Sequence, residues 1–346
     1  MTILPENIEK ILILRAGQLG DTVWASSIIE PLRKQFGQHI RIHWAAKSGI
    51  GNLFEHDNRI EKIYHLTNRK IPIPFNLRKV SIIQESLREP YDLIINLEFG
   101  NIMNDVMRFT RARHKVGQPY SYVDTQSRQH VVEKLNLFFE SFLKPGSLDV
   151  ALPSILGAPL SQINEKFNLP SKYIVVVPSN SHHKRSSKRN LRAWPNEHWK
   201  SLFKVLQSKN IHTIIVGGSG EEAFFQQFEP LPANIHSLVG RTSFSELSGI
   251  ITHANAVITT DTGPGHIAAA VNTPVLAIIG PTDFRRTGPF KSVNNKVSIL
   301  SANLPCSPCY HTEQEKNCRF NKCMEDVTPE SVMDELLKVI DYIPHP

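Results

Sequence analysis

Two stretches of the sequence place an acidic residue beside glycines directly after a short apolar run. Residues 11–14 are apolar and lead into residues 15–22, which read Arg-Ala-Gly-Gln-Leu-Gly-Asp-Thr. Residues 258–260 lead into Asp261, Thr262 and Gly263, and an alanine-rich helix start follows. A helix N-terminus leaves backbone N–H groups unpaired and carries partial positive charge, which suits a phosphate group. The second stretch is therefore a candidate for binding a diphosphate without a metal ion.

The same residues have a simpler interpretation as helix caps. Aspartate or threonine at the start of a helix accepts hydrogen bonds from its first N–H groups whether or not a ligand binds. In the first stretch, Gly17 and Gly20 permit a tight turn and the close approach of a ligand, and Asp21 falls where the helix begins. Two such turns in the two halves of one chain favour a ligand cleft over two isolated caps.

Short apolar runs alternate with helical stretches in both halves of the chain. In the first half we expect strands at 11–14, 40–45, 63–66 and 93–97, and helices at 26–36 and 80–88. In the second half we expect strands at 173–177, 211–216, 256–259 and 275–279, and helices at 196–208, 243–252 and 329–342. The alternation predicts an α/β protein with two doubly wound, Rossmann-like domains.

A less periodic stretch with several prolines, residues 144–159, separates the two halves. We place the domains at 1–155 and 156–346, and the last helix could pack back on the N-terminal domain. Ligands bind at the carboxyl edges of such sheets. We therefore expect the 17–22 turn to lie opposite the 261–266 turn across a cleft.

The composition is that of a globular protein with an anionic partner. Of the 346 residues, 40% are hydrophobic and 21% are charged, and no apolar run reaches the length of a membrane span. No basic region precedes an apolar segment near residue 1, so we expect no signal peptide and a cytoplasmic location. The formal net charge of +7 suits nucleic acid, a phosphorylated glycolipid or an anionic membrane face. Basic side chains gather at residues 108–115 and 182–192, although solvated surface would also explain both clusters.

The two turns, in this order, resemble the motifs of glycosyltransferase family 9, the bacterial ADP-heptose:lipopolysaccharide heptosyltransferases. The resemblance covers nearly the whole chain, and it includes residues 192–199, residues 217–221 and the turn at 280–282. Members of this family have the GT-B fold. The resemblance thus implies two Rossmann-like domains facing across a cleft, with the acceptor bound by the N-terminal domain and the nucleotide sugar by the C-terminal domain.

The resemblance also implies a reaction and a base. A heptose would pass from ADP-heptose to a phosphorylated glycolipid, the lipopolysaccharide inner core, with inversion and without a metal ion. The family's base is the aspartate of the first motif, which is Asp21 here, in the turn that carries Arg15, Gly17 and Gly20. A carboxylate is sufficient because the hydroxyl becomes acidic only as the new bond forms. We expect the protein to work at the cytoplasmic face of the inner membrane, where four basic residues approach the acceptor: Arg108, Arg111, Arg113 and Lys115.

The donor would be held by the second domain. The residues expected near its phosphates and hydroxyls are Asp261, Thr262, Gly263 and His266. Relatives bind phosphate with a lysine two residues before the tryptophan of a K-x-W-P segment. This chain has Arg192 at that position, so a planar guanidinium replaces the point charge of an ammonium group. Lys188 and Arg189 are rival candidates. An acid after the second glycine turn, Glu221 or Glu222, resembles the acid that binds the nucleotide ribose in relatives.

Several aromatic and sulfur-containing residues invite a ligand role. Trp194 and Trp199 lie at the start of an amphipathic helix, so we expect them in the core and not beneath a sugar. All four cysteines lie in one window, as Cys306, Cys309, Cys318 and Cys323. In a reducing compartment they could hold a structural zinc or iron ion, remain reduced or redox-labile thiols, or pair as disulfides. The proposed chemistry has no task for a metal, so we expect no cofactor in catalysis.

Three other functions compete with this prediction. An NAD-dependent dehydrogenase shares glycine turns after strands, but neither 17–20 nor 217–220 completes G-x-G-x-x-G. A non-enzymatic anion-binding protein would explain the basic clusters, yet no module typical of nucleic-acid binding accompanies them, and we expect no nucleic-acid partner. The same fold could also transfer a sugar to a protein or to another glycan.

Overall fold

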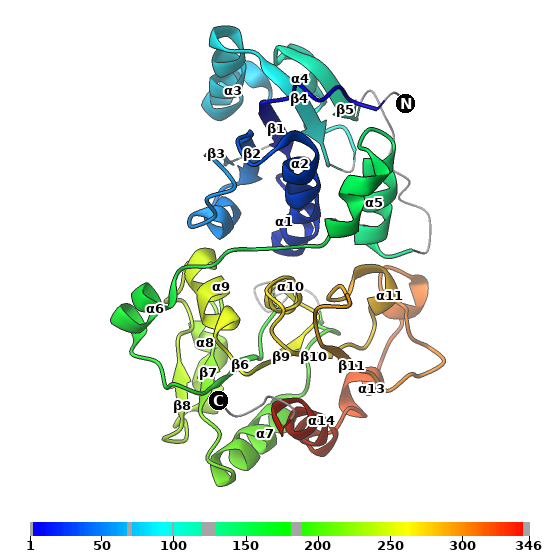
Figure 1. Ribbon diagram of the computed structural model, residues 1–346. Coiled ribbons are helices and arrows are strands. Elements are labelled where there is room, and N and C mark those ends of the chain that lie inside the picture. The colour runs from blue at the N-terminus through cyan, green and yellow to red at the C-terminus, as the bar shows by residue number, and fades with distance from the viewer. Residues whose placement is uncertain (1–2, 68–70, 99, 119–128, 181–188, 342–346) are drawn as a thin grey trace. The chain divides into compact units, whose positions relative to one another are not determined.

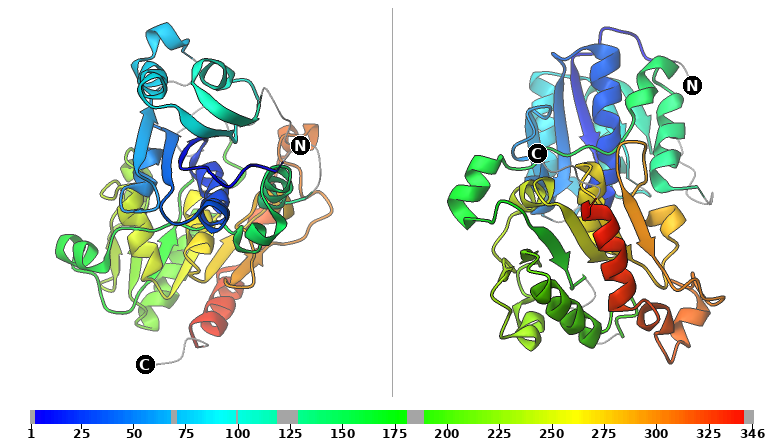
Figure 2. Two further views of the ribbon diagram at one scale, coloured as in Figure 1. Left: turned by 45° about the horizontal axis from the view of Figure 1, so that its top comes forward. Right: turned by 60° about the horizontal axis from the view of Figure 1, so that its bottom comes forward.

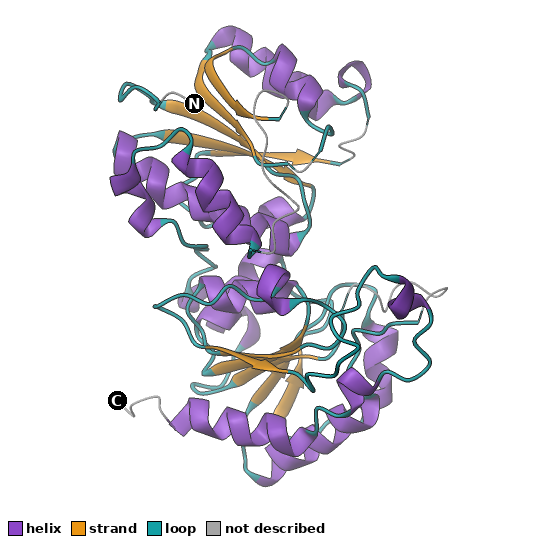
Figure 3. Ribbon diagram, turned by 90° about the vertical axis from the view of Figure 1, so that its right-hand side faces the viewer, coloured by secondary structure: helices purple, strands orange, loops and turns teal. Residues whose placement is uncertain are grey.

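The chain divides into two compact units, Met1–Leu156 and Gly157–Pro346. The computed structural model (Figure 1) describes residues 3–67, 71–98, 100–118, 129–180 and 189–341. Each described unit is a parallel sheet with helices on both faces, as Figure 3 shows. This is the α/β architecture that the alternation of strands and helices predicts.

The sheet of the first unit has the strand order β3-β2-β1-β4-β5, and every pair in it is parallel. Its strands are β1 (Lys10–Leu14), β2 (Arg41–Lys47), β3 (Lys62–Leu66), β4 (Tyr91–Asn96) and β5 (Ala112–Gly117). Its helices are α1 (Leu19–Ala25), α2 (Ile29–Phe36), α3 (Leu77–Arg88), α4 (Asn104–Phe109) and α5 (Val131–Glu140). β1 lies at the centre, where all five of its residues are buried, as expected for a strand covered on both faces.

The sheet of the second unit has the order β11-β10-β9-β6-β7-β8, again with parallel pairs. Its strands are β6 (Ile174–Val177), β7 (Thr213–Ile215), β8 (Ile235–Ser237), β9 (Ala256–Thr260), β10 (Val275–Ile278) and β11 (Val297–Leu300). The longer helices are α6 (Leu160–Phe167), α7 (Asn196–Ser208), α9 (Phe244–Thr252), α10 (Gly263–Ala270) and α14 (Pro329–Asp341). Four shorter helices are α8 (Glu222–Phe225), α11 (Phe284–Thr287), α12 (Glu313–Lys316) and α13 (Lys322–Glu325).

The core of the second unit contains both tryptophans of the 192–199 motif. Trp194 and Trp199 are at most 1% exposed and meet edge to face with ring centroids 4.7 Å apart. The indole N–H of Trp194 donates to the carbonyl oxygen of Val327 at 2.7 Å. The prediction that these rings pack in the core, and do not form a sugar platform, is therefore confirmed.

The C-terminal helix α14 packs on elements of its own unit. It contacts α7 and strands β9 and β10, and Figure 2 shows it (red) beside them. Val332, Met333 and Leu336 supply its buried stripe, which joins the core around Trp199. The apolar face that could have packed back on the N-terminal domain thus completes the core of the second unit.

Candidate functional site

The first glycine turn connects β1 to α1 at the carboxyl edge of its sheet, and it holds Asp21 by two contacts. The guanidinium of Arg15 donates from Nη2 to Asp21 Oδ1 at 2.9 Å, and the backbone N–H of Gln18 donates to Asp21 Oδ2 at 2.8 Å. The carboxylate is 29% exposed, whereas Arg15 is only 4% exposed. Each carboxylate oxygen keeps a further lone pair, so the group can still accept a proton from a ligand.

Asp21 is therefore also a helix cap, as the simpler interpretation predicts. It occupies the first turn of α1, and its bond from Gln18 N satisfies a donor at the helix entrance. A Cβ atom at Gly17 would lie 2.6 Å from Asp21 Cβ and Oδ2, so only glycine leaves room for this carboxylate. Gly20 is the second residue of α1 itself.

A second acid, Glu98, joins this turn from the end of β4. It is 4% exposed, it accepts a hydrogen bond from the backbone N–H of Ala16, and its Oε2 lies 3.9 Å from Arg15 Nη1. Arg15 Nη1 also donates to the carbonyl oxygen of Leu97 at 2.7 Å. Sequence reasoning missed Glu98, although an acid directly after the apolar run 93–97 was a usable signal. The result is an arginine fixed between two carboxylates and aimed at the one that is partly exposed.

The second candidate turn connects β9 to α10 at the carboxyl edge of the other sheet. Thr262 is the N-cap residue of α10, and Gly263 is the first residue of this eight-residue helix. Asp261 lies at the end of β9, where its carboxylate is 10% exposed and 3.3 Å from Arg192 Nη1. His266 lies one turn into the helix and is 7% exposed. The structure thus brings Arg192 to the start of α10, as the prediction for the donor site requires.

Three buried polar atoms at this edge have no hydrogen-bond partner among the described residues. They are Arg192 Nε and the hydroxyl oxygens of Thr260 and Thr282. Thr260 ends β9, and Thr282 lies in the turn after β10, the neighbouring strand. An unsatisfied buried polar atom costs free energy, so three such atoms at the carboxyl edge of this sheet make the edge a candidate ligand site. The sequence reasoning used the 280–282 turn as a motif but did not select Thr282, and it did not select Thr260.

The two acids after β7 have different surroundings. Glu221 is 8% exposed, and its Oε2 accepts hydrogen bonds from Ser179 Oγ at 2.5 Å and from Gly218 N at 2.9 Å. Glu222 is exposed. A Cβ atom built on Gly240 would be only 2.3 Å from Glu222 Oε1, so this carboxylate lies against Gly240. The carboxylate of Glu221 thus braces its own turn, whereas that of Glu222 faces solvent.

The rivals of Arg192 are placed differently or not described. Lys188 lies outside the described residues, and so do the other residues of the basic cluster up to position 188. Arg189 donates from Nη1 to the carbonyl oxygen of Cys318 at 3.0 Å and to that of Arg319. Its charge is therefore already used to hold another segment, which favours Arg192 as the cation of this edge.

The structure spreads the predicted acceptor residues over α4 and β5. Arg108 and Arg111 are exposed. Arg113 pairs with Asp92 at 3.1 Å, near the start of β5, so the cluster extends toward the amino edge of the sheet whose carboxyl edge carries Asp21. Lys115 donates to the carbonyl oxygens of Met107 at 2.7 Å and Arg108 at 3.3 Å, and burial lowers the pKa of its ammonium group. No helix within the described ranges has the length and apolar character needed to cross a bilayer.

The four cysteines lie on what we call the cysteine segment, residues 305–323, and all four are free thiols. Burial, followed by the nearby Cys309, Cys306 and Cys318, raises the pKa of Cys323 to about 11. Burial and the nearby Cys318 and Cys306 also raise the pKa of Cys309. Among the described residues, however, no three potential ligands are gathered closely enough to hold a metal ion. The disulfide interpretation does not apply to this arrangement, and a metal would require the thiols to move together.

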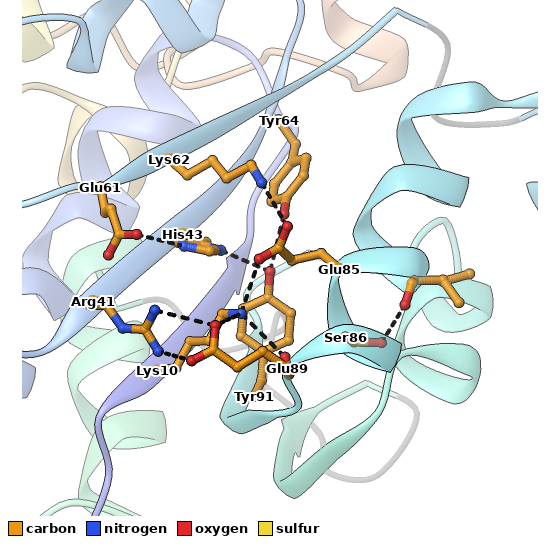
Figure 4. A network of polar contacts seen from close by, with 11 residues as sticks. Lys10, Arg41, His43, Glu61, Lys62, Tyr64, Glu85, Ser86, Glu89 and Tyr91 are labelled. Carbon is orange, nitrogen blue, oxygen red and sulfur yellow. Dashed lines mark hydrogen bonds and ion pairs between the residues drawn. The ribbon is translucent and has the colours of Figure 1, made fainter.

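A larger polar network lies at the opposite, amino edge of the first sheet (Figure 4). Lys10 is buried at the start of β1, where its ammonium group contacts Glu85 Oε1 at 3.1 Å and Glu89 Oε2 at 2.8 Å. The imidazole of His43 bonds the hydroxyl of Tyr91 at 2.8 Å, and burial lowers the pKa of His43 to about 4. Because ligands of parallel α/β sheets bind at the carboxyl edge, we assign this network to stability.

Two doubly wound parallel α/β units, each with polar groups at the carboxyl edge of its sheet, define a protein of the GT-B class. The chain belongs to glycosyltransferase family 9 (heptosyltransferase), whose family model matches residues 80–320. It is therefore an enzyme of the glycosyltransferase class, as the sequence motifs predict. The matched range contains the Arg192 and Asp261 region but begins after Asp21.

Three relatives illustrate the similarity. Lipopolysaccharide heptosyltransferase 3 of Escherichia coli K12 is 23% identical over 327 residues, which cover 87% of this chain and 90% of that protein. The crystal structure of a family 9 glycosyltransferase from Veillonella parvula matches with a TM-score of 0.79 at 16% identity, covering 98% of this chain and 99% of that one. The E. coli heptosyltransferase WaaC, solved with ADP, matches with a TM-score of 0.70 at 18% identity, covering 95% and 99%. These likenesses confirm the predicted fold.

Proposed function

We propose that this enzyme transfers a heptose from ADP-heptose to a lipopolysaccharide inner-core acceptor, with inversion and without a metal ion in the reaction. The observation that carries the proposal is the carboxyl edge of the second sheet, where Arg192 pairs with Asp261 before the start of α10, and where the hydroxyls of Thr260 and Thr282 have no partner among the described residues. Relatives named as lipopolysaccharide and lipooligosaccharide heptosyltransferases support the sugar and the acceptor. The relative solved with ADP supports the nucleotide.

The second unit binds the diphosphate in this proposal. A guanidinium has five N–H donors; the Asp261 carboxylate lies 3.3 Å from Nη1 of Arg192, and Nε has no partner among the described residues, so this guanidinium can donate to phosphate oxygens. The N–H of Gly263, the first residue of α10, adds a donor, and the helix N-terminus adds partial positive charge. Pro264 has no N–H, and the N–H of Gly265 donates to the carbonyl oxygen of Thr262 at 3.1 Å. Thr260 and Thr282 supply hydroxyls at the same edge. These groups neutralise the charge that develops on ADP as it leaves, which is the task a metal ion performs in other enzymes.

The first unit supplies the base. The acceptor oxygen forms a bond to the anomeric carbon while the bond from that carbon to the phosphate oxygen breaks, and the bonding electrons leave with ADP. Asp21 takes the proton of the acceptor hydroxyl as the new bond forms. Arg15 and the N–H of Gln18 fix the direction of its carboxylate, and positioning of this kind supplies much of the rate. The proposal requires that Asp21 and the bound donor act on the same sugar during turnover.

The ribose of ADP is bound by Glu222 and not by Glu221. The Glu222 carboxylate is exposed beside Gly240, at the carboxyl edge where the nucleotide binds. The carboxylate of Glu221 is buried and already accepts from Ser179 and Gly218. An exposed carboxylate can accept both ribose hydroxyls without breaking bonds within the protein.

The acceptor approaches the exposed basic residues of the first unit at the cytoplasmic face of the inner membrane. Arg108 and Arg111 are the candidates because both are exposed, whereas Arg113 pairs with Asp92 and Lys115 donates to the carbonyl oxygen of Met107 in α4. Phosphates of the glycolipid and anionic lipids would attract both arginines. Reversing the charge of Arg108 and Arg111 should raise the KM for the acceptor, and unchanged acceptor kinetics would remove this part of the proposal.

The four cysteines have a structural role, and their thiols take no part in the transfer. Burial and the nearby thiols raise the pKa of Cys309 and of Cys323, and a zinc or iron ion would favour their thiolate forms by binding them. Elemental analysis of the purified protein, with thiol titration before and after denaturation, distinguishes a metal site from free thiols. In either case the metal-free protein should retain its turnover. Loss of transfer on chelation, restored by the metal, would contradict a purely structural role.

The decisive experiment incubates the enzyme with ADP-heptose and purified lipopolysaccharide cores that lack successive heptoses, in the presence of a chelator. Mass spectrometry should detect one core that gains a single heptose, and NMR of the product should give the anomeric configuration opposite to that of the donor. Transfer only to proteins or other glycans would keep the enzyme class and reassign the acceptor. Turnover that stops with the chelator would contradict metal independence, and tight NAD binding without use of an ADP-sugar would reject the proposal.

A further inference from the structure

The aromatic ring of Tyr310, on the cysteine segment, lies against the guanidinium of Arg192. The Cζ atom of Arg192 is 5.6 Å from the centroid of the ring. This distance is within the range of a cation–π contact, in which a ring face attracts the positive charge. Tyr310 is more than 100 residues from Arg192 along the chain, and the 192–199 motif does not indicate it.

The cysteine segment is fixed at this position by backbone contacts at Tyr310 and at the residue before it. The N–H groups of Cys309 and Tyr310 both donate to the carbonyl oxygen of Pro281, at 2.8 and 2.9 Å. Pro281 precedes Thr282 in the turn after β10. The segment is thereby anchored to the turn that carries one of the unpartnered hydroxyls of the candidate donor site.

The same segment is also bound to the stretch of chain that carries Arg192. Arg189 donates to the carbonyl oxygen of Cys318 at 3.0 Å, and the amide of Asn321 donates to that of Ala193 at 3.3 Å. These contacts lie on both sides of Arg192 in sequence. The ring of Tyr310 is therefore held against Arg192 by a docked segment and does not depend on a single flexible side chain.

The geometry leaves the in-plane donors of Arg192 available. A guanidinium donates hydrogen bonds in its plane, whereas an aromatic ring contacts its charged group without accepting those donors in full. Asp261 lies at Nη1, and Nε has no partner among the described residues. A long arginine side chain loses rotamer freedom when it binds a phosphate, and a ring that holds it beforehand reduces that loss.

We propose that Tyr310 is a positioning residue that holds Arg192 for the donor diphosphate. The proposal rests on the proposed function, since it takes Arg192 as the phosphate-binding cation. It gives the cysteine segment a role at the donor site, because the state of this segment sets the position of the ring. Tyr310 itself takes no part in the reaction.

The test measures ADP binding by calorimetry in Tyr310→Leu and Tyr310→Phe. Leucine removes the π face, and we expect the Kd for ADP to rise by about threefold to tenfold. Phenylalanine keeps the ring and with it the contact with the guanidinium, so Tyr310→Phe should weaken ADP binding clearly less than Tyr310→Leu does. In turnover, Tyr310→Leu should raise the KM for the donor and leave the KM for the acceptor unchanged. Equal weakening in both variants would overturn the proposal, because the ring is common to the wild type and Tyr310→Phe.

A double-mutant cycle separates this inference from the proposed function. In an Arg192→Ala background, Tyr310→Leu should change the Kd for ADP by less than about twofold, since the ring then has no cation to hold. An undiminished effect of Tyr310→Leu in that background overturns the positioning role but keeps Arg192 as the donor cation. Unchanged ADP binding in Arg192→Ala alone rejects the donor site itself, and with it the inference.

Two further variants distinguish loss of the ring contact from general disturbance or unfolding of the segment. Phe320→Leu alters an exposed ring of the same segment and should leave ADP binding unchanged. Thermal unfolding of every variant reports loss of the fold, and Tyr310→Met replaces Tyr310→Leu if the latter does not fold. A Kd for Phe320→Leu that rises as much as that for Tyr310→Leu would overturn the proposal, since any disturbance of the segment would then suffice.

Discussion

Replacing Asp21 by asparagine changes one atom of the proposed base and nothing of its size. In the wild type each carboxylate oxygen accepts one bond, from Arg15 at 2.9 Å and from Gln18 N at 2.8 Å. An amide has one accepting oxygen, so one of these contacts must be lost. A hydrogen bond to a charged group contributes about 1.5–3 kcal/mol when buried. Because the Asp21 side chain is 29% exposed, we expect a loss of about 1–2 kcal/mol in the free energy of unfolding.

The effect on catalysis should be larger than the effect on stability. Removing a positioned general base costs roughly 10²–10⁴ in rate, which corresponds to about 3–5 kcal/mol in the activation barrier. The donor groups lie in the other unit, so the Kd for ADP should stay within about twofold of the wild-type value. The assay follows ADP release under donor and acceptor saturation, alongside urea unfolding of the same preparation.

A matched control separates the base from the helix cap. Asn76 caps α3 in the same unit by accepting from the N–H groups of Arg78 and Lys79, both at 3.2 Å. Asn76→Ala should lower the free energy of unfolding by about 1 kcal/mol and leave turnover within about twofold. If Asp21→Asn turned over at more than a tenth of the wild-type rate, or if Asn76→Ala lost as much activity, the base assignment would be refuted.

Three further changes have defined outcomes. Gly17→Ala places a Cβ 2.6 Å from Asp21 Oδ2, so we expect about 1–3 kcal/mol of destabilisation in urea unfolding. Transfer, followed by ADP release, should fall by at least tenfold. Full activity would show that the carboxylate position is not critical. The pKa of His43 is about 4 in the folded protein against 6.5 unfolded, so stability is complete above pH 6.5 and falls by up to about 3 kcal/mol as the pH drops toward 4. His43→Gln should flatten that slope in urea titrations between pH 7 and 4, and an identical slope would contradict the assignment. Glu222→Gln should raise the KM for ADP-heptose with little change in thermal unfolding, whereas Glu221→Gln should lower the unfolding temperature, and the reverse pattern would exchange their roles.

The sequence alone determined the architecture and the two turns of the candidate site. Helix α7 begins and ends at the predicted residues, and both glycine turns connect a buried strand to a helix as expected. These features are local, because hydrophobic periodicity and turn residues act over a few positions. Strand β5 was missed because an edge strand needs little apolar content, and half of its residues are basic.

Tertiary structure decided which side chains surround those turns. It brought Glu98 beside Arg15 and Tyr310 beside Arg192, across more than 80 residues in the first case and more than 100 in the second. It also gave Glu221 and Glu222 different surroundings, although the two are adjacent in sequence. Strand order and loop docking bring such residues together, and neither is encoded in the spacing of a motif. The sequence by itself therefore determined where the chemistry belongs in each sheet, whereas only the packing of distant segments decided which charges, rings and hydroxyls meet there.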